Sequence, residues 1–196
     1  MTFSKVLSRC ALLLLLSLSL NASAQSGTPG ITDVTMSMLN WIKHLDSEAD
    51  KFVTKEKAPQ LKQYFEDLKQ DLKIYMKTRK TLSDSIFRNN IGPGKKDVFN
   101  FETLKQQMST VMGRMRDVTD LTSKELRAEG DKLNDDLYNV LYGDKNEYLS
   151  ALEAFLAGHE VTKKDLALDG STCYNRLEQC VNLITGIQAK IDRKAK

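Results

Sequence analysis

The chain has 196 residues, with 29 Lys and Arg against 26 Asp and Glu and a hydrophobic fraction of 41%. A formal net charge of +3 gives no argument for a nucleic-acid partner, and three cysteines are too few for a disulfide scaffold. The length suits a single domain that buries a sizeable core.

Residues 1–24 have the organisation of a secretory signal peptide. A short basic start precedes an apolar run over residues 10–20, and residues 22–24 (Ala-Ser-Ala) form a small-x-small cleavage site. The run is shorter than the roughly 20 apolar residues that a transmembrane helix needs. We expect cleavage before Gln25 and export to a periplasmic or extracellular compartment, with no transmembrane segment in the mature chain. An uncleaved anchor is the alternative.

Cleavage would bring the charge of the chain close to neutrality. Lys5 and Arg9 would leave with the signal peptide, so 27 basic and 26 acidic residues would remain. A near-neutral mature chain predicts no nucleic-acid binding. Residues 25–31 are expected to form a flexible mature N-terminus, residues 32–192 a single α-helical bundle domain, and residues 193–196 a basic tail.

Apolar residues recur at intervals of three and four along the mature chain, which places them on one face of a helix. Four long segments, over about 32–56, 59–87, 100–142 and 162–192, predict an all-α fold. We expect an elongated up-and-down bundle with coiled-coil-like packing and a short helix over residues 145–157. The predicted core stripes are Val34, Met38, Trp41, Leu45, Ala49 and Phe52; Leu61, Phe65, Leu68, Leu72, Tyr75, Leu82 and Ile86, with Arg79 in one slot; Phe101, Leu104, Met108, Val111, Met115 and Val118; Leu126, Leu133, Leu137 and Val140; and Cys173, Leu177, Cys180, Ile184, Ile187 and Ile191.

Several residues mark the predicted helix ends. Pro59 suits a first helical turn, and residues 92–94 (Gly-Pro-Gly) cannot continue a helix. Asn100 is a good N-cap for the third segment, and Gly143 fits its end. Residues 162–165 carry the cap of the last helix. The short apolar helix, with Leu152 and Phe155, is interpreted as a cap on one end of the bundle; a movable lid is the alternative.

The segment from Asn100 to Tyr142 is compatible with one helix or two. Thr122–Glu125 reads as a capping box, which could start a new helix, and Gly130 is a second weak point. One continuous helix would span about 65 Å at 1.5 Å per residue. Such a helix would overhang the second segment and require a partner, a bend or exposed apolar surface.

Two resemblances concern this architecture. Leu121–Glu125 resembles, over five residues, the LTxxQ element of periplasmic helical chaperones of the Spy type, with Glu125 in place of Gln. The general plan, a signal peptide followed by a helical bundle, is similar to that of minor components of conjugation and type IV secretion systems. The capping box accounts for the first resemblance, and no residue carries the second, so no family is assigned.

The sequence contains no HExxH, GxSxG, SxxK, Walker A or GxGxxG motif. We predict no catalytic, cofactor-binding or metal-binding residues and no cofactor. His44 and Glu48 lie one helical turn apart and could share a metal, but a polar surface cluster is the preferred interpretation. His159 is interpreted as a solvated loop residue. The methionines, including Met108 and Met115, are expected to fill the core, with a haem pocket or an adaptable apolar binding surface as alternatives.

Cys173 and Cys180 both lie on the apolar stripe of the last segment. In a continuous helix, residues seven apart are separated by about 10.5 Å along the axis, whereas a disulfide needs Cα atoms within about 7 Å. We therefore predict two buried thiols with no disulfide between them. A break at residues 170–172 would allow the bond, and an intermolecular bond is a third possibility.

These observations predict an exported, non-enzymatic helical protein that acts through protein–protein interaction or self-association. A binding or accessory component of a secretion or conjugation apparatus fits this description. The alternatives are a ligand-carrying helical bundle, with haem, a metal or an apolar molecule, and a periplasmic chaperone-like protein.

Overall fold

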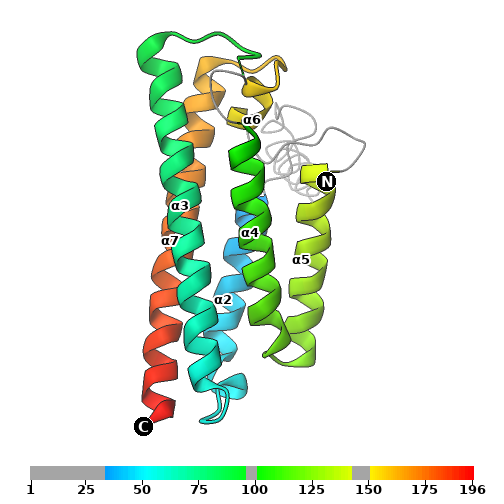
Figure 1. The fold of residues 1–196 in the computed structure, drawn as a ribbon, viewed down its shortest axis with the longest axis vertical. Helices are drawn as coiled ribbons and strands as arrows, with labels where there is room; N and C mark the ends of the chain where they lie inside the picture. Colours follow the sequence, from blue (N-terminus) through cyan, green and yellow to red (C-terminus); the bar gives the residue numbers. More distant parts are fainter. Residues whose placement is uncertain (1–33, 96–100, 143–150) are drawn as a thin grey trace, which may run out of the picture.

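The computed structural model describes residues 34–95, 101–142 and 151–196, which form an elongated bundle of helices (Figure 1). The predicted signal peptide and its cleavage site lie outside the described residues. The all-α prediction is confirmed, and the described residues contain no strand. The helices, labelled as in Figure 1, are α2 (Val34–Phe52), α3 (Ala58–Asn89), α4 (Phe101–Asp120), α5 (Lys124–Tyr142), α6 (Ala151–Leu156) and α7 (Lys163–Ala195).

Five of these helices close a ring around the core. α2 packs against α7, α7 against α3, α3 against α4, α4 against α5, and α5 against α2. The short helix α6 packs against α7, at the end of the bundle where α7 begins (Figure 1). None of the helices in the described part of the chain combines the length and the apolar character needed to cross a membrane.

Ion pairs between helices show the direction of their packing. Lys190 contacts Asp46, and Lys194, one turn later on α7, contacts Asp50, one turn later on α2, so these two helices run parallel. The pairs between α3 and α7 run in the opposite order. Lys62 near the start of α3 contacts Asp192 near the end of α7, and these two longest helices are therefore antiparallel.

The core follows the predicted stripes. Every predicted stripe residue whose side chain is described is buried, including Arg79; the side chains of Phe101 and Val140 lie outside the described set. The methionine prediction is also confirmed for Met108 and Met115, which are fully buried, whereas Met36 is 38% exposed. Spacing alone therefore identified the core face of each long helix.

The segment from Asn100 to Tyr142 forms two helices. α4 ends at Asp120 and α5 begins at Lys124, so the chain folds back on itself and no long overhang is left. The predicted capping box at Thr122–Glu125 is wrong by one residue. The backbone N–H of Leu126 donates to the Ser123 hydroxyl at 3.4 Å, and the Thr122 hydroxyl donates to the Thr119 carbonyl at 2.7 Å. Ser123 is thus the N-cap, because Thr122 closes the preceding turn.

Gly130 is a contact point between three helices. A Cβ atom at this position would lie 2.4 Å from Thr119 Oγ1 on α4 and 3.2 Å from Trp41 Nε1 on α2. The helix is continuous through the residue, and Trp41 Nε1 lies 3.5 Å from the Leu126 carbonyl that accepts its hydrogen bond. The missing side chain therefore allows α5 to approach both neighbours, and the prediction of a weak point in the helix is corrected.

The helix ends agree with the predicted signals where they are described. Pro59 lies in the first turn of α3, and Thr162 and Asp165 form a reciprocal capping box at the start of α7. α7 continues to Ala195, so it includes most of the predicted basic tail. Asn100, Gly143 and the predicted start of the short helix lie outside the described residues.

The short helix α6 closes one end of the bundle. Leu152, Phe155 and Leu156 are buried, which supports the interpretation as a cap. The Gly94 N–H donates to the Phe155 carbonyl at 3.0 Å and joins the end of the α3 loop to α6. Gly94 has a φ of +73°, a conformation that a residue with a Cβ rarely adopts.

A carboxylate on α3 joins this helix to α7. Glu66 accepts hydrogen bonds from Lys69 at 2.5 Å, from Gln188 at 2.8 Å and from Gln70 at 2.7 Å. These bonds, that of Lys69 first, lower the pKa of Glu66 from 4.5 to about 2. The ionised carboxylate is therefore more favourable in the folded chain than in the unfolded chain.

This lowered pKa predicts a dependence of stability on pH. The contribution of Glu66 to the free energy of unfolding is fully present above its unfolded pKa of 4.5. It is lost as the pH falls toward about 2. In urea unfolding, the stability difference between wild type and Glu66→Gln should be largest above about pH 5 and shrink below it. The side chain is 40% exposed, so the difference should be small. A difference that does not change with pH would contradict the prediction.

Candidate binding groove between α3 and α7

The histidines considered as metal ligands lie in separate surroundings. His44 Nδ1 lies 2.8 Å from the Glu129 carboxylate on α5, whereas Glu48 pairs with Lys51 on its own helix. The His159 N–H donates to the Ala154 carbonyl at 3.0 Å, beyond α6. Within residues 34–95, 101–142 and 151–196, no three His, Cys, Asp or Glu side chains come together as a metal site would require. His44 and Glu48, whose sharing of a metal was the less favoured interpretation of the sequence, therefore have separate partners.

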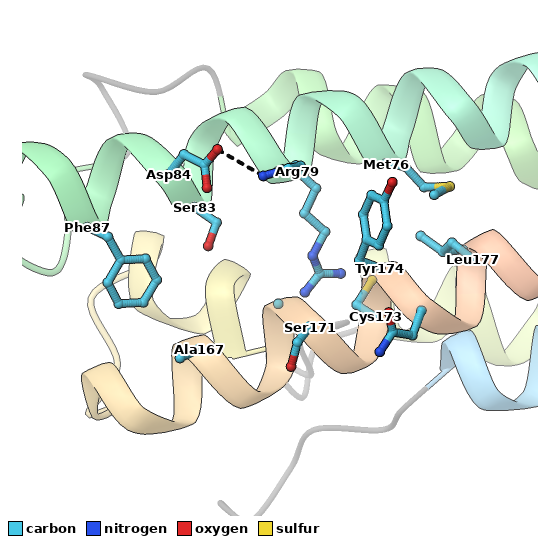
Figure 2. A pocket seen from close by; sticks show the side chains of 13 residues that line it. Met76, Arg79, Ser83, Asp84, Phe87, Ala167, Ser171, Cys173, Tyr174 and Leu177 are labelled. Carbon is cyan, nitrogen blue, oxygen red and sulfur yellow. Dashed lines mark hydrogen bonds and ion pairs between the residues drawn. The ribbon is translucent and has the colours of Figure 1, made fainter.

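The outer surface between α3 and α7 contains a groove of about 380 Å³ (Figure 2). Its α3 side comprises residues from Met76 to Phe87, and its α7 side residues from Ala167 to Leu177. Phe87 and Tyr174 border it and are 40% and 38% exposed. The full lining is Met76, Arg79, Lys80, Ser83, Asp84, Phe87, Ala167, Gly170, Ser171, Cys173, Tyr174, Asn175 and Leu177.

Small residues create the groove. The small residues of α7 are Ala167, Gly170 and Ser171, which are spaced three and one apart and so share one side of the helix. Across from them, a Cβ at Gly170 would lie 3.5 Å from the Ser83 hydroxyl of α3. The two helices therefore approach closely at the floor, and the short side chains leave space above it.

An ion pair between buried Arg79 and half-buried Asp169 links the two helices beneath the groove. The Arg79 side chain is 4% exposed and extends from α3 toward α7 (Figure 2). Its Nη2 lies 2.5 Å from the Asp169 carboxylate, and its Nη1 donates to the Tyr75 hydroxyl at 3.3 Å. Arg79, which interrupted the predicted apolar stripe, is therefore a structural link whose charge is balanced inside the protein.

The prediction for the cysteines is confirmed. α7 is continuous through Gly170, Cys173 and Cys180, both thiols are buried, and they form no disulfide with each other. Burial, with a further effect of Cys173, raises the pKa of Cys180 to about 12. Because the thiolate is the reactive form, a protonated buried thiol can persist in an oxidising compartment.

Substitution of Cys180 provides a test of this burial. Cys180→Ala should lower the free energy of unfolding by about 1 kcal/mol through a small cavity. Cys180→Ser should cost more, because it buries a hydroxyl with no assured partner. Thiol labelling without reductant should reach both cysteines only after denaturation. Monomer that stays unlabelled when denatured would instead indicate a disulfide.

Sequence reasoning did not find the groove. The sequence predicts no site residues, and it presents residues 170–172 only as a place where the helix could break. The signal that was present is the cluster of small residues on one side of α7. Comparison with family models, with curated proteins and with solved structures gives no match to this chain, so no family is identified.

Proposed function

We propose that the chain is an exported, non-enzymatic helical protein that binds another protein through the groove between α3 and α7. The observation that carries the proposal is the groove itself, with Phe87 and Tyr174 partly exposed at its borders. A mainly apolar depression bordered by aromatic side chains is suited to contact with a protein surface. The charged side chains that line the groove form ion pairs, Arg79 with Asp169 and Lys80 with Asp84.

Export is the part of the proposal that rests on residues 1–24. The basic start, the apolar run and the small-x-small site support cleavage before Gln25. N-terminal sequencing of protein from the native host should begin at Gln25. Ala24→Phe should block processing and leave the precursor of 22.2 kDa. Mature protein that keeps Met1, found in the cytoplasm, would contradict export.

The binding role can be tested by cross-linking in the native host. A photoreactive amino acid at Ser171 lies in the groove, whereas the same group at Gln106 lies on the exposed side of α4. We expect one defined protein, identified by mass spectrometry, to be linked from Ser171 and not from Gln106.

A groove-filling variant supplies the control for this experiment. Ala167→Trp places a large side chain at an exposed groove position, and Ala189→Trp makes the same change at an exposed position further along α7. Cross-linking should be lost in the first variant and kept in the second. Equal cross-linking in both variants, or none from Ser171 in wild type, would argue against the proposed function.

A further inference from the structure

One rim of the groove is basic. Lys73, Lys77, Lys80, Asp84 and Arg88 are spaced four, three, four and four along α3, so they form a stripe on one side of this helix. Lys80 and Asp84 line the groove, so Lys77 and Arg88, which flank them on α3, lie beside its rim. Lys73 lies three residues before Met76, the first lining residue of α3. All four basic residues are exposed. The stripe thus carries four positive charges and one negative charge.

The single acidic residue of the stripe already has partners. Asp84 lies 3.0 Å from Lys80 Nζ and 4.0 Å from Arg88 Nη2. Among the ion pairs of the described residues, none involves Lys73 or Lys77. The surplus positive charge of this rim therefore faces solvent and is available to a bound molecule.

The opposite rim has a different character. Ser171 and Asn175 of α7 are exposed and neutral. On the same side of the helix, exposed Lys164 precedes them and exposed Glu178 follows them. Between the rims, the apolar lining is recessed: Met76 is 8% exposed and Cys173 4%. The groove is therefore asymmetric, with an apolar floor, a basic stripe beside its α3 edge and a neutral edge along α7.

We infer that the groove binds one amphipathic helix of a partner protein, with its apolar face on the floor and an acidic edge along α3. The lining of α3 from Met76 to Phe87 spans about 16 Å at 1.5 Å per residue, which is about three helical turns. A helix in a groove is anchored by large apolar side chains spaced three and four apart. The groove volume of about 380 Å³ accommodates such an anchor.

The basic stripe on α3 is the reason for inferring that the partner helix has an acidic edge. Asp or Glu residues along the partner helix would face Lys73 and Lys77, whereas basic residues there would meet like charges. A flat anionic membrane would also attract the basic stripe, but it would not fill a recessed floor. The shape of the groove therefore favours a helix over a lipid surface.

This inference rests on the proposed function, and a display library can test it separately. The library presents amphipathic helices of about four turns with a fixed apolar face and edges randomised among acidic, basic and neutral residues. Selection on wild-type protein, with Ala167→Trp protein as the counter-selection, should enrich helices with Asp or Glu along one edge. No enrichment, or enrichment of neutral or basic edges, would overturn the inference.

Binding of one selected synthetic peptide then tests the basic rim. Lys73→Glu/Lys77→Glu should weaken the affinity about tenfold or more, measured by fluorescence anisotropy. Lys124→Glu/Lys132→Glu on α5 makes the same change of net charge and should leave the affinity within about twofold. An equal loss of affinity in both double variants would mean that only the net charge of the protein matters. It would overturn the inference that the acidic edge of the helix lies along α3.

The outcomes separate the inference from the proposed function. If a protein is cross-linked from Ser171 but the library selects no acidic edge, the inferred acidic helix is wrong and the proposed function stands. Absence of any cross-linked protein would overturn the proposed function itself. Binding to phosphatidylglycerol vesicles that is lost in Lys73→Glu/Lys77→Glu, without peptide enrichment, would assign the stripe to a membrane surface.

Discussion

Replacement of Asp169 by Ala should lower the free energy of unfolding by about 3 kcal/mol. Removal of one partner of a buried ion pair leaves the other charge uncompensated in a medium of low polarity. The Arg79 side chain is 4% exposed and could not reach water without disturbing the packing of α3 on α7. The Asp169 side chain is 21% exposed, which places the expected cost at the lower end of that for buried pairs.

An exposed pair on α3, the helix that carries Arg79, provides the matched control. Asp84 contacts Lys80 at 3.0 Å, with side chains that are 42% and 59% exposed. Asp84→Ala should change stability by less than about 0.5 kcal/mol, because solvent screens exposed pairs. Urea unfolding of both variants measures the difference. If Asp169→Ala were no more destabilised than Asp84→Ala, the pair beneath the groove would not hold the two helices together.

Substitution of Gly130 by Ala should destabilise the bundle by about 1–2 kcal/mol. In an open helix the change would stabilise by roughly 1 kcal/mol, because Ala has the higher helix propensity. Here the new Cβ would lie 2.4 Å from Thr119 Oγ1 and 3.0 Å from its Cγ2. Thr119 is fully buried and its hydroxyl donates to the Met115 carbonyl at 2.7 Å, so the overlap should outweigh the gain.

Two further variants test whether overlap with Thr119 is the cause of the destabilisation by Gly130→Ala. Gly113 on α4 has no neighbouring atom within 4 Å of a new Cβ, so Gly113→Ala should raise the stability. Thr119→Ala removes the two nearest of the three atoms that a Cβ at Gly130 would meet, and Trp41 Nε1 at 3.2 Å remains. In a double-mutant cycle, Gly130→Ala should therefore cost less in the Thr119→Ala background. A stabilising Gly130→Ala would show that α5 does not approach α4 this closely.

The faces of the helices could be predicted from the sequence. Apolar residues spaced three and four apart mark the side of a helix that faces the core, whichever element packs against it. This spacing predicts that Cys173 and Cys180 are buried, as the structure shows. Even Arg79 was located on the buried face by the residues around it. Its partner Asp169 was not predictable, because nothing in a single stripe indicates which helix will lie against it.

The groove depends on contacts that periodicity does not report. Gly130 and Gly170 both appeared as weak points in helices, since the sequence shows the low helix propensity of glycine and not its neighbours. The structure places each where another helix approaches. A depression arises where small residues of two distant segments meet, here Ser83 and Gly170, and only the packing of α3 on α7 brings them together.

Hydrogen exchange on the complex with the cross-linked partner tests most directly whether this groove is the binding site. Binding through the groove should slow exchange in two separate segments, residues 76–87 of α3 and residues 167–177 of α7. The surfaces of α4 and α5 should exchange at unchanged rates, and Ala167→Trp should abolish the protection while Ala189→Trp retains it. Protection centred on α4 and α5, with the two groove segments unchanged, would contradict a binding role for the groove.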